Sequence, residues 1–154
     1  MTEIGDSIPE IALTRPDGST VSAADYAGKA WVLYFYPKDD TSGCTKEAQE
    51  FSAHLEEFEA AGVSVLGVSK DPPKKHQKFI EKYGLTVPLA SDAETDGLAE
   101  AMGVWIEKSM YGKKYMGMDR STFLIGQDGK VVRTWRKVKV AGHVGEVLAE
   151  ARAL

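Results

Sequence analysis

The chain has 154 residues, of which 43% are hydrophobic and 27% charged, with a formal net charge of −4. This size and composition are typical of one globular domain, residues 1–154, and exclude a disordered chain. The net negative charge and the scattered Lys and Arg residues argue against a nucleic-acid partner. Apolar stretches are too short to cross a bilayer and no signal-peptide pattern is present, so we expect a cytoplasmic protein with no membrane partner.

The first third of the chain predicts a hairpin followed by a buried strand. Short strands at Ile11–Thr14 and Thr20–Val21 flank the dipeptide Asp17-Gly18, which favours tight turns. Trp31 to Tyr36 is a continuous aromatic and aliphatic run, typical of a strand that is buried on both faces. Pro37 ends this strand.

The next segment predicts an amphipathic helix that ends near Gly62. After the turn-rich residues 38–43, apolar side chains recur at a spacing of three and four residues. They are Ala48, Phe51, Leu55 and Phe58. Counting back four residues from Ala48 places Cys44 in the first turn of this helix, on the stripe that faces the core.

The rest of the chain alternates between strand and helix patterns and ends with a hairpin and a helix. We expect strands at Val63–Val68 and Leu85–Ala90, helices at Pro72–Tyr83 and Glu94–Met102, strands at Ser121–Ile125 and Val131–Trp135, and a last helix at Gly142–Ala153. This order predicts an α/β protein with a thioredoxin-like fold: a central mixed β-sheet flanked by helices on both faces, with an N-terminal β-hairpin.

Cys44 is the only cysteine, which excludes an internal disulfide and a zinc site built from several thiolates. A thiol attacks as its thiolate, and at the ordinary cysteine pKa of about 8.5 only a few per cent is ionised at pH 7. Unpaired N–H groups in the first turn of a helix stabilise such an anion. Thr41, three residues earlier, is placed to add a hydroxyl group. Without this context, a lone cysteine in a helix would be read as a small buried hydrophobe.

The sequence P-K-D-D-T-S-G-C, which contains Pro37, Thr41 and Cys44, resembles the P-x-x-x-T-x-x-C signature of peroxiredoxins. F-Y-P-K-D-D-T-S-G-C-T-K-E-A and the later D-R-S-T-F-L-I are similar to the bacterioferritin comigratory protein branch, also called PrxQ, and the resemblance covers nearly the whole chain. It implies a thiol-dependent peroxidase that reduces hydrogen peroxide and organic hydroperoxides through a Cys44 sulfenic acid. No metal or organic cofactor is implied.

The same resemblance assigns roles to five residues. Cys44 is the peroxidatic cysteine, Thr41 a hydrogen-bond partner of peroxide and thiolate, and Arg120 the activating cation. Pro37 shields the pocket from water, and Glu47 helps to orient the arginine. From spacing alone Glu47 could equally be a helix-surface charge, and Arg120 a surface or ion-pair residue.

The sequence departs from this branch at Gln49, where many members carry a resolving cysteine. The predicted helix 94–102 contains no cysteine either. The sulfenic acid must therefore be reduced by an external thiol such as thioredoxin, glutaredoxin or a small thiol, or by Cys44 of another subunit. The resemblance implies a monomer or weak homodimer.

Other residues invite less specific interpretations. The histidines, His54, His76 and His143, lack metal-ligand spacing and are predicted to be solvated or capping. Five lysines are predicted on the wet face of one helix: Lys70, Lys74, Lys75, Lys78 and Lys82. An apolar group could border a mouth over the site or pack in the core and rim: Trp105, Met110, Tyr111, Tyr115, Met116 and Met118.

Two alternative functions remain to be compared with a peroxidase. A redox carrier on the same fold would need a Cys-x-x-Cys pair, which the chain lacks. A non-enzymatic peroxide sensor or redox binding module, which passes oxidation to a partner, would differ by stopping after one oxidation event.

Overall fold

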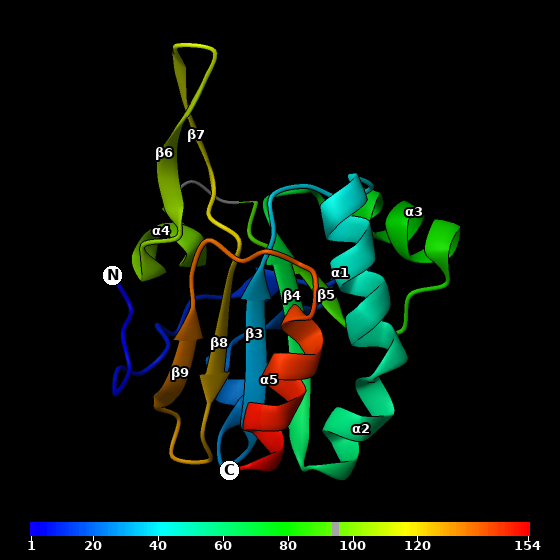
Figure 1. The fold of residues 1–154 in the computed structure, drawn as a ribbon, viewed down its shortest axis with the longest axis vertical. Helices are drawn as coiled ribbons and strands as arrows, with labels where there is room; N and C mark the ends of the chain where they lie inside the picture. The colour runs from blue at the N-terminus through cyan, green and yellow to red at the C-terminus, as the bar shows by residue number, and fades with distance from the viewer. Residues whose placement is uncertain (94–95) are drawn as a thin grey trace.

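The computed structural model describes residues 1–93 and 96–154, and a seven-stranded mixed sheet forms the centre of this part of the chain (Figure 1). The strand order is β2-β1-β5-β4-β3-β8-β9. The bounds are Leu13–Thr14 (β1), Thr20–Val21 (β2), Ala30–Phe35 (β3), Val63–Ser69 (β4), Leu89–Ser91 (β5), Ser121–Ile125 (β8) and Val131–Trp135 (β9). The predicted N-terminal hairpin is confirmed, since β1 and β2 pair antiparallel.

The pairing of β3 determines where the site can lie. β3 runs parallel to β4 and antiparallel to β8, and Phe35 at the end of β3 is opposite Ser121 at the start of β8. Residues that follow β3 and residues that precede β8 therefore meet at one edge of the sheet.

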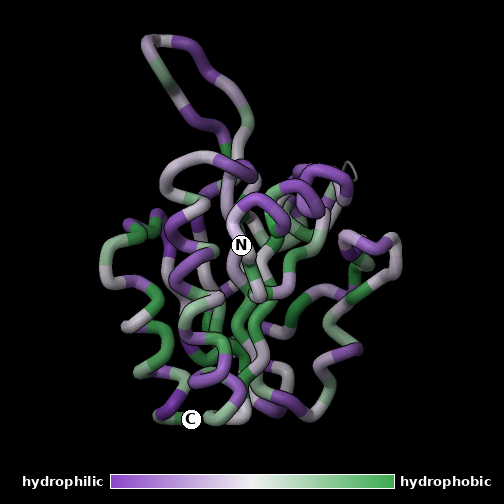
Figure 2. Tube along the Cα trace, turned by 90° about the vertical axis from the view of Figure 1, so that its right-hand side faces the viewer, coloured by the Kyte–Doolittle hydropathy of each residue, from purple (hydrophilic) through white to green (hydrophobic). Residues whose placement is uncertain are grey.

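Helices cover both faces of this sheet, as predicted. Val32 and Tyr34 of β3 face one core cluster, together with residues of α1 (Ser42–Ala53), α2 (Leu55–Ala60), α3 (Pro73–Tyr83) and α5 (His143–Arg152). The alternate residues Leu33 and Phe35 face a second cluster, with α4 (Leu98–Met102) and the 3-10 helix η1 (Ala23–Tyr26). The central strands are accordingly the most continuously hydrophobic segments of the trace (Figure 2).

A second, two-stranded sheet was not predicted. β6 (Trp105–Met110) and β7 (Lys113–Met118) form an antiparallel hairpin that projects from one end of the molecule (Figure 1). Of the apolar residues considered above, Met118 is buried and Trp105 half-buried. The others are exposed along the hairpin: Met110, Tyr111, Tyr115 and Met116. The group is thus split between the core and an exposed arm.

Three predicted boundaries were wrong. The helix before Gly62 is broken at His54 into α1 and α2. The strand expected from Leu85 begins at Leu89, because Pro88 has no N–H group to join the ladder. α4 begins at Leu98, and part of its predicted first turn, residues 94–95, lies outside the described residues.

The predictions for charged residues also need correction. His76 is completely buried rather than solvated, and His143, at the first position of α5, is 4% exposed. Lys70 lies after β4 rather than on a helix, and its ammonium group pairs with the carboxylates of Asp92 and Glu100. Among the described residues, no helix is long and apolar enough to cross a membrane.

Candidate active site

Cys44 lies in the first turn of α1 and is 1% exposed. The helix begins at Ser42 after Thr41, whose extended backbone makes it the N-cap residue. The first N–H groups of a helix have no acceptor within the helix, so the Cys44 sulfur lies at the positive end of α1. The Thr41 hydroxyl donates a hydrogen bond to the carbonyl oxygen of Lys38 at 2.8 Å.

Arg120 contacts Cys44 from the start of the neighbouring strand, β8. It directly precedes β8, and its guanidinium Nη2 lies 3.3 Å from the Sγ atom of Cys44. Burial disfavours the charge of Arg120, but the neighbouring Glu47 and Cys44 groups raise its pKa above the ordinary value. The guanidinium is therefore a permanent cation beside the sulfur.

Glu47 is the counter-ion of Arg120 and is fully buried. Its Oε1 atom accepts a hydrogen bond from Nη1 of Arg120 at 2.8 Å. Burial raises the pKa of Glu47 to about 7, although the Arg120 charge and hydrogen bond act in the opposite direction. Its Oε2 atom has no hydrogen-bond partner within residues 1–93 and 96–154. Glu47 is therefore not a helix-surface charge.

Gly43 leaves the space that the guanidinium occupies. A Cβ atom at this position would lie 3.2 Å from Nη2 of Arg120, closer than Cβ atoms normally approach other atoms. The glycine thus leaves the guanidinium a few tenths of an ångström more room than an alanine would, and no sequence pattern pointed to it.

Comparison with known proteins identifies the family. Residues 4–134 match the model of the AhpC/TSA family. The chain belongs to this family. Among curated relatives, Peroxiredoxin Bcp of Bacillus subtilis is 49% identical over 146 residues, covering 95% of this chain and 92% of the relative. Peroxiredoxin Bcp of Escherichia coli is 42% identical over 144 residues, covering 94% and 92%.

Solved structures agree with this assignment. A structure of Xanthomonas campestris Peroxiredoxin Q has a TM-score of 0.90 at 45% identity, covering 99% of this chain and 96% of that one. A Xylella fastidiosa PrxQ mutant has a TM-score of 0.93 at 41% identity, covering 99% and 97%. The thioredoxin-like fold and the PrxQ resemblance are therefore confirmed, and the chain is a thiol-dependent peroxidase whose single cysteine fits the absence of a resolving cysteine.

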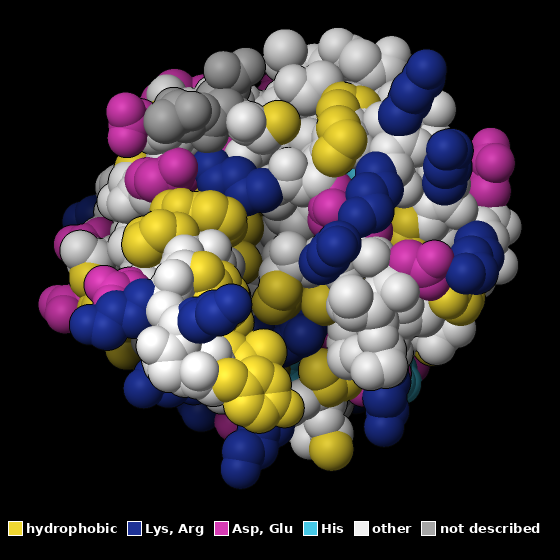
Figure 3. All heavy atoms as spheres, turned by 90° about the horizontal axis from the view of Figure 1, so that it is seen from above, with side chains coloured by type: hydrophobic (Ala, Val, Ile, Leu, Met, Phe, Trp, Pro, Cys, Tyr) yellow, Lys and Arg dark blue, Asp and Glu magenta, His cyan; other side chains and the backbone are white. Residues whose placement is uncertain are grey.

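The predicted site residues of this peroxiredoxin lie on the loop after β3, in the first two turns of α1 and directly before β8. Cys44, Glu47 and Arg120 are in contact, as the distances above show. Thr41 is exposed and Pro37 half-buried, both on the loop between β3 and α1. At this end of the molecule, hydrophobic side chains surround a hollow with a Lys or Arg side chain at its floor (Figure 3).

Sequence reasoning missed a buried histidine near the arginine. His143 Nε2 lies 2.8 Å from Oγ1 of Thr122 in β8. Burial lowers the pKa of His143 to about 4, and the charge of Arg120 acts in the same direction. The ring is therefore neutral at pH 7. In the part of the chain that the structure describes, no group of three His, Cys, Asp or Glu side chains could hold a metal.

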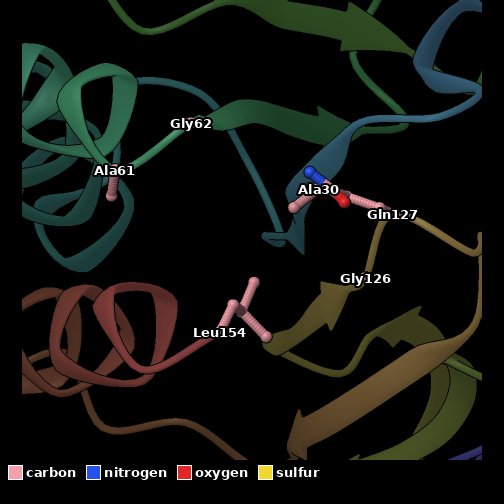
Figure 4. A pocket seen from close by; sticks show the side chains of 6 residues that line it. All are labelled: Ala30, Ala61, Gly62, Gly126, Gln127 and Leu154. Atoms are coloured by element: carbon pink, nitrogen blue, oxygen red, sulfur yellow. The ribbon is translucent and has the colours of Figure 1, made fainter.

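A cavity of about 320 Å³ lies at the opposite end of β3 from Cys44 (Figure 4). It is lined by Ala30, Ala61, Gly62, Gly126, Gln127 and Leu154. None of these side chains ionises or acts as a nucleophile, so we assign no chemistry to this cavity.

Proposed function

We propose that Cys44, Thr41, Arg120, Pro37 and Glu47 form the catalytic site with which this peroxiredoxin reduces hydroperoxides. The observation that carries the proposal is the 3.3 Å contact between Arg120 Nη2 and Cys44 Sγ in the first turn of α1. A fixed cation and the positive end of a helix thus lie beside the sulfur that is to attack the peroxide. A related Xanthomonas campestris protein has been described for alkyl peroxide reduction, which supports organic hydroperoxides beside hydrogen peroxide as substrates.

The proposed reaction begins with attack of the Cys44 thiolate on the terminal peroxide oxygen. The S–O bond forms while the O–O bond breaks, and the sulfur loses two electrons as it becomes sulfenic acid. The leaving oxygen takes a proton and departs as water or alcohol. Arg120 stabilises the charge that moves from sulfur to this oxygen, since its guanidinium donates several hydrogen bonds in a fixed plane.

Glu47 and the two loop residues support this step in different ways. Glu47 holds Nη1 of Arg120 and thereby directs Nη2 to the sulfur. The Thr41 hydroxyl donates its hydrogen to the Lys38 carbonyl oxygen, so its oxygen would accept a hydrogen bond from the bound peroxide. Pro37, on the same loop, would shield the peroxide pocket from water, and it has no N–H group of its own to hydrate.

An external thiol completes the proposed cycle. It attacks the sulfenic sulfur, releases water and forms a mixed disulfide, and a second thiol then returns Cys44 to its reduced form. Thioredoxin, glutaredoxin and small thiols each supply the required chemistry. Such a cycle needs a reducing compartment, which supports a cytoplasmic location. The family resemblance is the ground for proposing a monomer or weak homodimer.

Stopped-flow kinetics test this function. The reduced protein is mixed with hydrogen peroxide or an organic hydroperoxide, and Trp fluorescence follows oxidation; excess thiol is then added to measure turnover. We expect oxidation far faster than that of a free thiol, multiple turnovers, and no reaction of Cys44→Ser. A single oxidation event without turnover would indicate the sensor function instead.

A further inference from the structure

The carboxylate of Asp39 is buried in the loop that leads from β3 to Cys44. Its Oδ1 atom accepts a hydrogen bond from the Tyr36 hydroxyl at 2.5 Å, and its Oδ2 atom lies 2.6 Å from Nδ1 of His76 in α3. The second ring nitrogen of His76, Nε2, lies 3.1 Å from the carbonyl oxygen of Ala90 in β5. Asp39 is 2% exposed and His76 is not exposed at all. The loop is thus joined to two neighbouring elements through one histidine.

The backbone of Asp39 is held by a second buried carboxylate. Its N–H group donates to Oδ2 of Asp71 at 2.8 Å, and the same oxygen accepts a hydrogen bond from the Ser69 hydroxyl at 2.7 Å. Lys75 neutralises this carboxylate from α3, with Nζ 3.1 Å from Oδ1. Both the side chain and the main chain of Asp39 are therefore fixed from outside the loop.

The hydrogen-bond inventory determines how many protons the Asp39–His76 pair holds. A carbonyl oxygen can only accept, so Nε2 of His76 carries a proton toward Ala90. One further proton must lie between Nδ1 and Oδ2, because otherwise two acceptor atoms would face each other at 2.6 Å, too close for a water molecule between them. Removal of either partner would leave a buried polar group unsatisfied.

We propose that His76 and Asp39 are positioning residues that fix the loop of residues 36–41, between β3 and α1, so that Cys44 in the first turn of α1 faces Arg120. The inference rests on the proposed role of Cys44 as the peroxide-reducing nucleophile. Neither residue is in contact with the sulfur or the guanidinium; they act through the path of the loop. A displacement of about 1 Å in a reacting atom lowers a rate about 100-fold, so a short unsupported loop between β3 and α1 would be a poor scaffold.

The exposed contacts of the next residue, Asp40, provide a control for the buried pair. Asp40 lies 2.9 Å from Nζ of Lys82 and accepts a hydrogen bond from the Tyr83 hydroxyl, also in α3. These contacts are exposed to solvent, where ion pairs contribute little. If burial of the Asp39–His76 pair is what fixes the loop, loss of the Asp40 contacts should have little effect on Cys44.

Two substitutions of His76 separate its two hydrogen bonds. In His76→Asn the amide nitrogen falls near the position of Nδ1 and retains the bond to Asp39. In His76→Gln the amide nitrogen falls near the position of Nε2 and retains the bond to Ala90 but not the one to Asp39. Both variants lose the ring and one hydrogen bond, so their loss of stability should be similar.

The readout is the rate of Cys44 oxidation by hydrogen peroxide, and rescue by the conservative variant distinguishes positioning from a general loss of stability. Urea unfolding ensures that each variant is folded in the assay. We expect His76→Gln to slow oxidation at least about tenfold. His76→Asn should recover the rate to within about threefold, and Asp40→Asn should remain within about twofold of the unmodified protein.

A second pair of variants serves if the His76 variants do not fold. Asp39→Asn can satisfy both Tyr36 and a neutral His76, whereas Asp39→Ala satisfies neither, so only the alanine variant should slow oxidation. Equal slowing within each pair, or unchanged rates in both His76→Gln and Asp39→Ala, would overturn the inference. A failure of the unmodified protein to react with peroxide would instead refute the proposed function.

Discussion

Nη2 of Arg120 lies 3.3 Å from Sγ of Cys44, although 76 residues separate the two in the sequence. The antiparallel pairing of β3 with β8 produces this contact, because it places the end of one strand beside the start of the other. The same guanidinium donates through Nη1 to the buried Glu47 carboxylate. The planar guanidinium thus contacts both the Cys44 sulfur and Glu47, the counter-ion of the arginine.

Arg120→Lys should slow oxidation of Cys44 strongly without unfolding the protein. A lysine ammonium retains the charge but cannot present two nitrogens in a fixed plane to Glu47 and Cys44 at once. We expect a decrease of about 100-fold in the second-order rate constant with hydrogen peroxide, the usual effect of removing a donor to a developing charge. Stopped-flow fluorescence measures the rate and circular dichroism the fold. Near-normal kinetics would remove Arg120 from the catalytic residues.

Gly43→Ala tests whether the guanidinium needs the space beside the first turn of α1. The added Cβ atom would lie 3.2 Å from Nη2, so the guanidinium must shift by a few tenths of an ångström, which disturbs its contact with the sulfur. We expect a decrease of roughly tenfold in the oxidation rate. Alanine is the better helix former by about 0.5–1 kcal/mol, so stability should change little or rise.

Gly145→Ala in α5 is the matched control for this variant. A Cβ atom at Gly145 would meet no other atom within 4 Å. It should raise the free energy of unfolding by about 0.5–1 kcal/mol and leave the oxidation rate unchanged. Equal oxidation rates in Gly43→Ala and the unmodified protein would show that Arg120 is not confined as the structure indicates.

Part of this site could be predicted from the local sequence pattern, and part of it could not. The helical spacing back from Ala48 placed Cys44 in the first turn of a helix, which is a local property of the chain. Arg120 came only from the family resemblance, because no local pattern reports which strand ends share a sheet edge. The role of Glu47 beside the arginine also came only from the resemblance, since its spacing fitted a charge on the helix surface equally well.

Other misses arose where the local pattern pointed the wrong way. His76 stands in a Lys-rich helix, and nothing in that composition shows that its face turns toward Asp39. The β6–β7 hairpin has side chains exposed on both faces, so it lacks the alternation of polar and apolar residues that marks a half-buried strand.

The single-cysteine cycle predicts a defined set of products. One equivalent of peroxide should add one oxygen atom to the intact protein, and a small thiol should then convert this species to a mixed disulfide at Cys44. Intact-mass spectrometry distinguishes both from the reduced protein, with Cys44→Ser as the unreactive control. Peroxide consumption by a protein whose mass stays unchanged throughout would contradict the cycle.

The buried Glu47 should make stability depend on pH in a particular direction. Its pKa is about 7 in the folded protein and 4.5 as the ordinary value, so between these values the folded state binds more protons than the unfolded state. The free energy of unfolding therefore falls as pH rises through this window, by on the order of 3 kcal/mol from Glu47 alone. Glu47→Gln removes this contribution because the amide does not titrate.

His143 acts in the opposite direction and would mask the effect in the unmodified protein. Its pKa falls from 6.5 to about 4 on folding, so its contribution is fully present above pH 6.5 and is lost as pH falls toward 4. The quantity to compare is therefore the difference in free energy of unfolding between Glu47→Gln and the unmodified protein. The His143 contribution cancels in this difference because both proteins carry the histidine. Urea unfolding at pH 5 and pH 8 should show this difference shifting in favour of the variant at the higher pH. If the free energies of unfolding of the two proteins instead changed in parallel between pH 5 and pH 8, Glu47 would titrate as an ordinary carboxylate. Its burial beside Arg120 would then not raise its pKa.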